Sequence, residues 1–386
     1  MLPVNTIPSR PVRVLWITPE LQGGIASYSR ILWPAVADAA RAEGHFELLS
    51  NVQTAPGARA DAIAAARDLQ PDLVHVQHEY GLFGGMNPFL DGLPQWMRQL
   101  RDAVPNGTRI VATAHNVVPD GYRLETRGQG WRSPLNRMVN AMMLPWLRRR
   151  WRKDTWGRFD GVIVHSALQA QLLEAGGLSP IATIPHVVPE IRTSPREQPR
   201  NPVPRITVFG YFTPEKGQDV VIEALRLMKT PALLRLAGGV GHPANDAYHE
   251  QCRQRIADGG LGDRVEVTGF VPEADITRHF DEADLVVAPF RRTSGSGSLV
   301  QALSRGAPVL GSDLPLNREI NDRVPDTLAF FASEDPLDCA RQIELLLADA
   351  DRRRRLGQQA LLYAANHSPS VIAREHLGFY RQVIET

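Results

Sequence analysis

Cysteine and long apolar runs are both scarce in this chain of 386 residues, and each scarcity argues against a class of protein. Two cysteines, Cys252 and Cys339, are too few for a disulfide framework and lack metal-site spacing, so they fit a reducing compartment. No apolar run approaches the roughly 20 residues of a membrane-spanning helix, and the first residues lack the apolar core of a secretory signal. We therefore expect a cytoplasmic protein.

Charge of one sign is not in excess either, because the formal net charge is only +1. Such a balance argues against nucleic-acid binding as the main purpose, so we expect no nucleic-acid partner. The hydrophobic fraction of 43% is ordinary for a globular protein. The length exceeds the size at which a single core usually stops growing, which predicts two domains.

Short apolar runs alternate with helix-like segments along most of the chain. "VRVLWIT" (12–18) is typical of a buried strand, and after Gly23 and Gly24 apolar residues recur at helical spacing. The alternation continues to about residue 190 and starts again at residue 205. This pattern predicts an α/β fold with parallel sheets that are covered by helices on both faces.

A proline-rich stretch separates the two series and predicts the domain organisation. Residues 189–205 hold five prolines, several charges and few apolar residues, which indicates a linker. Two open α/β domains of this kind leave a cleft at the carboxyl ends of their strands, where ligands usually bind. The predicted parts are an N-terminal domain (1–190), a linker (191–204), a C-terminal domain (205–365) and a C-terminal helix (366–386) able to pack back on the N-terminal domain.

The stretch "TSGSGSLVQ" (293–301) holds the strongest candidate site. Small and hydroxylated residues precede a helix expected to start near Leu299, and the amides and dipole of a helix start attract an anion without a metal. A flexible glycine-serine loop is the alternative, which the apolar strand before it and the helix after it disfavour. The candidate residues are Thr293, Ser294, Gly295, Ser296, Gly297, Ser298, Leu299 and Gln301.

Two further turns could face an anion. Gly23 and Gly24 lie between a strand and a helix, where a phosphate could approach the backbone amides closely, and a plain tight turn is the alternative. Lys216, in "GYFTPEKGQD" (210–219), follows the first strand of the second series and could neutralise a diphosphate. The alternative for Lys216 is a solvated surface lysine.

The order of several motifs resembles glycosyltransferase family 4, whose members are retaining transferases of the GT-B fold. The likeness covers nearly the whole chain and is tightest over 206–313. It implies two Rossmann-like parallel-sheet domains facing across a cleft, with the nucleotide sugar on the second domain and the acceptor on the first. The motifs are "GGIASYSR", "VATAHN", "IPHVV", "GYFTPEKG", "VEVTGFVPEADI", "TSGSGSLVQ" and "GAPVLGSD".

The resemblance also implies roles for single residues. A lysine in the position of Lys216 contacts the donor diphosphate, and the turn at Gly23 and Gly24 lies near it. A histidine in the position of His115 sits beside the transferred sugar, with packing at a strand end as the alternative. Tyr211 stands where the family often has an arginine, so a second positive contact is missing there.

Two glutamates that the family often carries are absent. Counting back from "GAPV" (306–309) places them at Thr293 and Gln301, and a shift of one residue would place the first at Ser294. Replacing a charged partner by a neutral one loses about 1 kcal/mol per hydrogen bond, which is tenfold or less. We therefore predict a working donor loop, in which Gln301 accepts from a ribose hydroxyl, over the alternative of a dead relic.

Acceptor contacts are predicted at His78 and Glu79 in "VQHEYGLFGG" (76–85), with Glu79 as a base. An ordered loop with a packed histidine is the alternative. The resemblance implies that the donor phosphate takes the acceptor's proton, which leaves positioning and stabilisation of the leaving diphosphate to the protein.

A basic, apolar segment around 137–153 predicts contact with an anionic membrane surface. Tryptophans interleaved with basic residues suit such a surface, at about 1 kcal/mol per basic residue. A core-facing helix with a solvated basic end is the alternative. The apolar stripe is Leu135, Met138, Val139, Met142 and Trp146, and the basic cluster is Arg148, Arg149, Arg150, Arg152 and Lys153.

Together these interpretations predict a retaining, metal-independent glycosyltransferase that needs no cofactor besides its GDP- or UDP-linked donor. It moves a hexose, with mannose as the first guess, to a glycan acceptor such as a lipid-linked polysaccharide intermediate. We expect it in the cytoplasm, peripheral to the inner membrane. Two alternatives are a sugar-nucleotide epimerase of the same fold and a non-catalytic protein that binds a sugar nucleotide.

Overall fold

The chain folds into two compact units in the computed structural model. One unit comprises residues 1–187 with 369–386, and the other comprises residues 188–368. In the described part of each unit the strands form a six-stranded parallel sheet, which confirms the predicted α/β fold. The structure describes residues 10–84, 92–118, 123, 132–144, 146, 155–175, 177, 180–189, 191–193, 196–197, 199, 201–241, 245–292 and 297–386.

The first unit has the strand order β2-β1-β3-β4-β5-β6. Its strands are β1 (Val12–Thr18), β2 (Phe46–Gln53), β3 (Leu73–His78), β4 (Arg109–Ala114), β5 (Gly161–Val164) and β6 (Ile181–Thr183). Its helices are α1 (Gly24–Glu43), α2 (Ala60–Leu69), α3 (Leu93–Ala103), α4 (Arg132–Met138), α6 (Ala167–Glu174) and α14 (Pro369–Glu385), with a π-helical turn (Val139–Met143) and a 3-10 turn (Trp156–Arg158).

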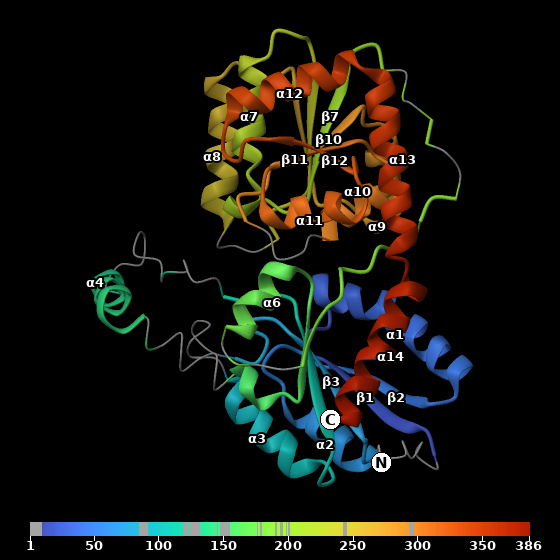
Figure 1. The fold of residues 1–386 in the computed structure, drawn as a ribbon. Coiled ribbons are helices and arrows are strands. Elements are labelled where there is room, and N and C mark those ends of the chain that lie inside the picture. Colours follow the sequence, from blue (N-terminus) through green and yellow to red (C-terminus); the bar gives the residue numbers. More distant parts are fainter. Residues whose placement is uncertain are drawn as a thin grey trace. The chain divides into compact units, whose positions relative to one another are not determined.

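Side chains that alternate along β1 show how the first sheet is covered on both faces. Leu15 and Ile17 join a cluster with residues of α2 and α3. Val14 and Trp16 point to the opposite face, where they join a cluster with residues of α1 and α14. Figure 1 shows α1 and α14 together on that face. A continuous apolar strand is therefore required, as the run 12–18 predicted.

The last helix, α14, is part of the first unit's core. It packs along α1, and its Ile372 and Leu377 are fully buried. The Trp16 indole nitrogen donates a hydrogen bond of 2.9 Å to the Tyr380 hydroxyl. The final residues of the chain are thus joined to its first strand by packing and by a buried hydrogen bond.

The second unit has the strand order β12-β11-β10-β7-β8-β9. Its strands are β7 (Arg205–Phe209), β8 (Leu233–Ala237), β9 (Val265–Gly269), β10 (Leu285–Ala288), β11 (Val309–Ser312) and β12 (Leu328–Phe331). Its helices are α7 (Gln218–Leu227), α8 (Asp246–Asp258), α9 (Glu273–Asp281), α10 (Gly297–Ser304), α11 (Pro315–Arg323), α12 (Pro336–Ala348) and α13 (Ala350–Asn366), with a 3-10 turn (Pro214–Lys216).

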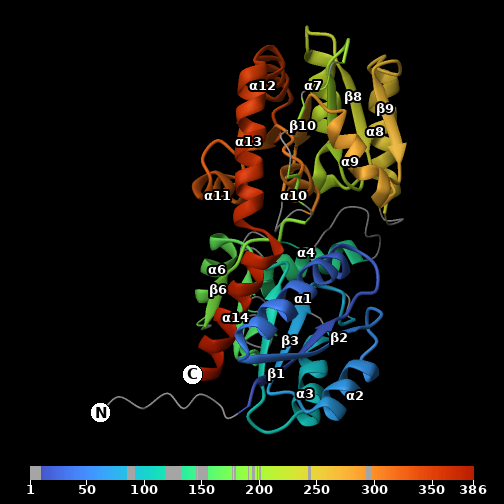
Figure 2. The ribbon, with the colours of Figure 1, turned by 90° about the vertical axis from the view of Figure 1, so that its right-hand side faces the viewer.

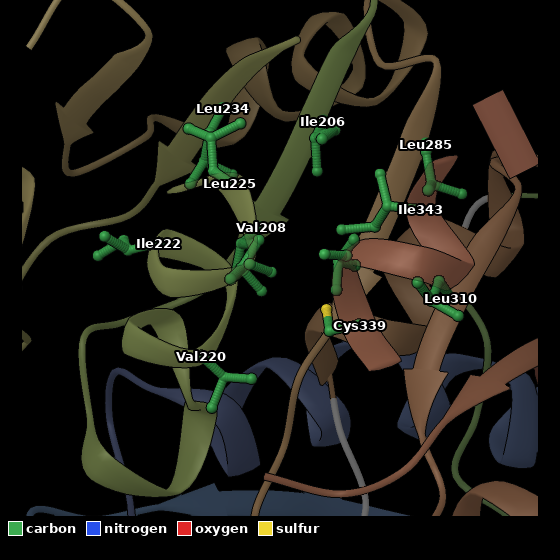
Figure 3. Close-up of a cluster of buried hydrophobic side chains, with 14 of the residues drawn as sticks. Ile206, Val208, Val220, Ile222, Leu225, Leu234, Leu285, Leu310, Cys339 and Ile343 are labelled. Carbon is green, nitrogen blue, oxygen red and sulfur yellow. The ribbon is translucent and has the colours of Figure 1, made fainter. Parts of the chain in front are cut away.

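The core of the second unit also fills both faces of its sheet. Figure 3 shows one face, where side chains of the strands gather with those of α7 and α12. The cluster includes Ile206 and Val208 of β7, and the free, buried thiol of Cys339. On the other face α10 packs against α13 (Figure 2), and this contact fixes the helix that carries the candidate donor loop.

The proline-rich segment that we predicted as a linker is held to the second unit. Arg192 pairs with Asp281 at the end of α9, and Arg196 donates to backbone carbonyls near the same helix. Asn201 donates to Asp284 over 2.7 Å. The described residues of this segment are therefore surface structure of the second unit rather than a chain without contacts, because their polar side chains find partners there.

Candidate functional site

The turn after β7 brings Lys216 to the end of β10. Lys216 closes the 3-10 turn, and Gly217 follows in the left-handed conformation, with φ of 68°. A Cβ atom at Gly217 would lie 2.1 Å from the Pro289 carbonyl oxygen. Only glycine permits both the conformation and this close approach, so the sequence "EKG" fixes the lysine beside the loop that follows β10.

Lys216 and Ser298, two predicted donor-site residues, lie together in the structure. The Lys216 Nζ atom is 3.1 Å from the Ser298 Oγ atom at the start of α10, and 4.1 Å from the centre of the Phe290 ring. Burial lowers the pKa of Lys216 to about 8. An anion at this helix start would restore the charged form, because an opposite charge favours protonated lysine.

An arginine that sequence reasoning missed holds the two sides of this site together. Arg291 lies just before the loop and makes two hydrogen bonds, of 2.9 and 2.8 Å, to the Asp219 carboxylate at the start of α7. It also donates to the Pro214 carbonyl, and its backbone nitrogen donates to that of Glu215. The Tyr248 hydroxyl adds a 2.6 Å bond to Asp219. This Arg291 clamp ties the Lys216 turn to the strand end before α10.

The clamp is a true charge pair. Its hydrogen bonds to Asp219 raise the pKa of Arg291. Burial works against ionisation of Asp219, but the bonds from Arg291 and Tyr248 outweigh it and hold the pKa of this carboxyl below its usual value. Both groups are therefore charged at neutral pH. The only sequence signal was an arginine next to the predicted loop.

Gln301 has a hydrogen-bond partner within the second unit. Its side-chain oxygen accepts from the Arg305 guanidinium, which also donates to the Thr277 hydroxyl over 3.1 Å. Arg305 uses one of the two lone pairs of this oxygen, so acceptance from a ribose hydroxyl stays a prediction. Arg305 could not be foreseen as the partner from spacing alone, although it lies one helical turn further on.

The remaining residues predicted for the donor site differ in exposure, and some of them lie outside the described residues. Gly297 is exposed at the first position of α10, and Leu299 is buried beneath it. Tyr211 is 50% exposed, and its carbonyl accepts from Gln218. Thr293, Ser294, Gly295 and Ser296 lie outside the described residues.

The glycine turn before α1 already holds an anion, the carboxylate of Glu20. One Glu20 oxygen accepts from the backbone nitrogens of Ile25 and Ala26 over 2.9 and 2.8 Å. A Cβ atom at Gly23 would come within 2.3 Å of this carboxylate, so the turn is shaped around it. A diphosphate at Gly23 and Gly24 would have to compete with Glu20 for these amides.

His115 lies after β4 with both ring nitrogens facing partners inside the first unit. Its Nε2 is 2.9 Å from the Gln77 side-chain oxygen, and its Nδ1 is 3.3 Å from His165 Nε2. Burial and the neighbouring imidazoles lower the pKa of His115 well below its ordinary value, which keeps the ring neutral. In this arrangement both nitrogens face groups of the first unit, and a place beside the transferred sugar stays a prediction.

The two predicted acceptor residues behave differently. The His78 ring has 0% exposure and packs against Tyr80, Phe83 and Trp156, so we assign it to packing rather than to acceptor binding. Glu79 is half-buried, and its carboxylate accepts from the Tyr80 backbone nitrogen. Burial raises the pKa of Glu79 to about 7, a value suited to a base.

The apolar stripe of the predicted membrane segment is exposed. Met138 is 49% exposed, Met142 is 76% and Trp146 is 54%, and α4 gives way to the π-helical turn after Met138. This exposure disagrees with the alternative of a core-facing helix. Residues 147–153, which include the basic cluster, lie outside the described residues. Among the helices described, none is long and apolar enough to cross a bilayer.

Comparison with known proteins finds a family model that matches most of the second unit. Residues 191–362 match the family model of glycosyl transferases group 1. The match contains the Lys216 turn, the Arg291 clamp and α10. A longer stretch of the chain is similar to the GDP-mannose:glycolipid 4-beta-D-mannosyltransferase of Xanthomonas campestris pv. campestris, with 27% identity over 221 residues. That alignment covers 56% of this chain and 54% of the relative, about half its length.

Solved structures resemble the chain over nearly its full length. The sucrose-phosphate synthase of Thermosynechococcus elongatus has a TM-score of 0.71 at 17% identity, covering 97% of this chain and 99% of that one. Anabaena Alr3699/HepE, solved in complex with UDP, has a TM-score of 0.66 at 13% identity, covering 96% and 100%. At such identities the likeness shows the fold, which is GT-B, as predicted. Membership of family 4 stays a prediction.

Proposed function

We propose that this protein is a glycosyltransferase that moves a hexose from a nucleoside-diphosphate donor to a glycan acceptor. One observation carries the proposal. Lys216 lies within hydrogen-bonding distance of Ser298 at the start of α10, inside the stretch that matches glycosyl transferases group 1. A lysine ammonium and a helix start together suit a diphosphate, which gains charge as it leaves.

The mechanism that we propose uses positioning rather than a protein nucleophile. Lys216 and the amides at the start of α10 stabilise the leaving diphosphate, and the Arg291 clamp holds the two in register. We further propose retention of configuration, no metal and no cofactor besides the donor. Transfer should then survive excess chelator, and activity restored only by magnesium or manganese would contradict metal independence.

The donor and the stereochemistry are open to direct measurement. The name of the Xanthomonas relative specifies GDP-mannose and a β-linked product, and the Anabaena neighbour was solved with UDP. We therefore propose a GDP- or UDP-linked hexose, with GDP-mannose to be tested first. Proton NMR of the first product gives its anomeric configuration, and inversion would contradict the retaining mechanism.

The decisive experiment combines a donor screen with one variant. Thermal-shift measurements against nucleotide sugars identify the donor, since a ligand at a hundred times its dissociation constant adds about 2.7 kcal/mol of stability. With that donor, Lys216→Ala should lower kcat about a hundred- to a thousandfold, because it removes a preorganised charge contact. Unchanged kcat at saturating donor would remove Lys216 from the chemistry. An isomerised donor, or binding without turnover, would instead favour the epimerase or the non-catalytic protein.

For the acceptor we propose a lipid-linked glycan at a cytoplasmic membrane surface. The exposed side chains of Met138, Met142 and Trp146 support this, because an apolar face next to basic residues suits an anionic bilayer. The relative from Xanthomonas is named for a glycolipid acceptor. A lipid-linked acceptor should therefore be used more efficiently in anionic vesicles than in detergent, and equal rates would argue against membrane contact.

A further inference from the structure

Three histidines and a tyrosine gather at the carboxyl ends of neighbouring strands of the first sheet. His115 follows β4, His165 follows β5 and His186 comes three residues after β6. The ring of Tyr28, from α1, lies among all three, with centroid distances of 4.8, 5.5 and 5.1 Å. Sequence reasoning assigned a role only to His115. In open α/β sheets this edge is where ligands bind.

The hydrogen positions of two of these rings follow from their partners. His165 Nδ1 is 2.9 Å from the Ile184 carbonyl, and His186 Nδ1 is 2.9 Å from the Val187 carbonyl. A carbonyl can only accept, so each Nδ1 carries the hydrogen. Burial lowers the pKa of both histidines, to about 3 for His165, so each is neutral and its Nε2 is a lone-pair acceptor.

The lone pairs on His165 Nε2 and His186 Nε2 have different surroundings. His115 Nε2 donates to the Gln77 side-chain oxygen over 2.9 Å, so His115 Nδ1 and His165 Nε2, 3.3 Å apart, are both lone pairs and form no hydrogen bond with each other. Each of these two lone pairs faces the other ring. His186 is only partly buried, and its Nε2 has no hydrogen-bond partner among the described residues. His186 therefore offers the acceptor that His115, the residue predicted from sequence, does not.

Tyr28 supplies the complementary donor. Its side chain is 1% exposed, and its hydroxyl has no hydrogen-bond partner in the described part of the chain. A buried hydroxyl without a partner is unfavourable and calls for an explanation, such as a ligand or a bound water. Neutral imidazoles offer no cation to a phosphate. A ring with an O–H donor, whose centroid lies 5.1 Å from that of a ring with a lone-pair acceptor, instead matches an alcohol, which accepts one hydrogen bond and donates another.

We propose that Tyr28 and His186 bind a hydroxyl group of the hexosyl substrate, with the Tyr28 hydroxyl donating to it and His186 Nε2 accepting from it. His115 and His165 are then positioning residues, because the Gln77 side-chain oxygen and the Ile184 carbonyl accept from them and hold the rings around Tyr28. The assignment of the hydroxyl to a hexosyl substrate rests on the proposed function. The pairing itself rests only on the geometry of the first unit.

The test uses methyl hexopyranosides, whose binding does not require transfer. Ligand-observed NMR with the methyl glucoside, mannoside and galactoside should detect binding to the wild-type protein. Tyr28→Phe and His186→Ala should each weaken it about two- to tenfold, the value of a neutral hydrogen bond. His186→Asn, which keeps an acceptor oxygen, should recover part of the loss. Because both residues bind one hydroxyl, the double variant should lose little more than the worse single variant.

Thermal stability separates this role from a structural one. Tyr28→Phe removes a hydroxyl that has no partner among the described residues, so its Tm should equal or exceed that of the wild type while hexoside binding falls. Tyr363→Phe, at a buried tyrosine of the second unit, is the matched control and should leave binding unchanged. No hexoside binding by the wild type, or equal binding by Tyr28→Phe, would overturn the proposal. Binding that depends on both residues, without transfer to any acceptor, would uphold it and instead refute the proposed function.

Discussion

Lys216 has a proton that its surroundings hold weakly, and this gives the proposed activity an alkaline limit. Burial lowers the pKa of Lys216 from 10.5 to about 8. Since the protonated form contacts the diphosphate, kcat/KM for the donor should fall as the pH rises above about 8. Lys216→Arg should be less active at its best pH but keep that activity to higher pH, because arginine stays charged. Profiles of kcat/KM for both proteins test this, and the same alkaline limb in both would contradict it.

Glu79 should make the free energy of unfolding depend on pH between about 4.5 and 7. Burial raises the pKa of Glu79 from 4.5 to about 7, so the folded state holds this proton more tightly than the unfolded state. The contribution of Glu79 to the free energy of unfolding is then fully present below pH 4.5 and is lost as the pH rises through 7. Glu79→Gln lacks this ionisation, so the Tm of the variant minus that of the wild type should increase as the pH rises from 4.5 to above 7. Calorimetry at several pH values measures the difference, and a constant difference would mean that Glu79 titrates normally.

The substitution Gln301→Glu restores a glutamate that family 4 often has at this position. In Gln301→Glu the new carboxylate would lie against Arg305, which already donates to this position, so the fold should tolerate the charge. A carboxylate accepts from ribose hydroxyls more strongly than an amide does, so donor KM should fall, by about tenfold at most. Donor titration with the purified variant measures this. A weaker donor affinity at unchanged Tm would show that the amide nitrogen of Gln301 is the group that serves the ligand.

At the scale of elements, the Arg291 clamp should set the distance between the Lys216 turn and α10. Arg291→Met keeps much of the side chain's apolar volume but removes its bonds to Asp219 and Pro214. Loss of hydrogen bonds to a charged group should lower the free energy of unfolding by about 1.5–3 kcal/mol. Donor affinity should fall as well, although Arg291 is not placed on the donor. The control is Arg318→Met, which removes the exposed ion pair between Arg318 of α11 and Asp313. It should change neither the free energy of unfolding nor the donor affinity appreciably. Normal donor affinity in a destabilised Arg291→Met protein would limit the clamp to stability.

The elements were more predictable from sequence than their side-chain partners. The apolar run 12–18 became β1, and the helix expected near Leu299 begins at Gly297, because burial of both sheet faces and glycine-rich turns leave a clear pattern. Glu20, by contrast, caps α1 from outside the helix, and His78 packs among rings contributed by separate segments. Such partners are set by tertiary packing, which spacing along the chain does not encode. The same reason explains why His186 was missed, whereas His115 was predicted from the family resemblance.

For the whole molecule, the exposed face of α4 and the π-helical turn should decide where the protein resides. Met142→Ser combined with Trp146→Ser removes apolar side chains that are more than half exposed, so stability should hardly change. Binding to anionic vesicles should fall, because less apolar surface can enter the interface. Sedimentation at physiological salt is the measurement, with neutral vesicles as the reference. Equal sedimentation of variant and wild type would assign this face to something other than lipid.

The position of α14 has a consequence for synthesis on the ribosome. Residues 188–368 are continuous in sequence, so the second unit can fold as soon as it has emerged, whereas Trp16 of the first unit must wait for Tyr380. The first 187 residues therefore spend the translation of the second unit without α14, so this face of their sheet is covered only in part, by α1. Apolar surface that is exposed for so long favours aggregation and calls for chaperone binding. A released chain that is truncated just before Pro369 should consequently be protected from protease over the second unit and still be cleaved in the first.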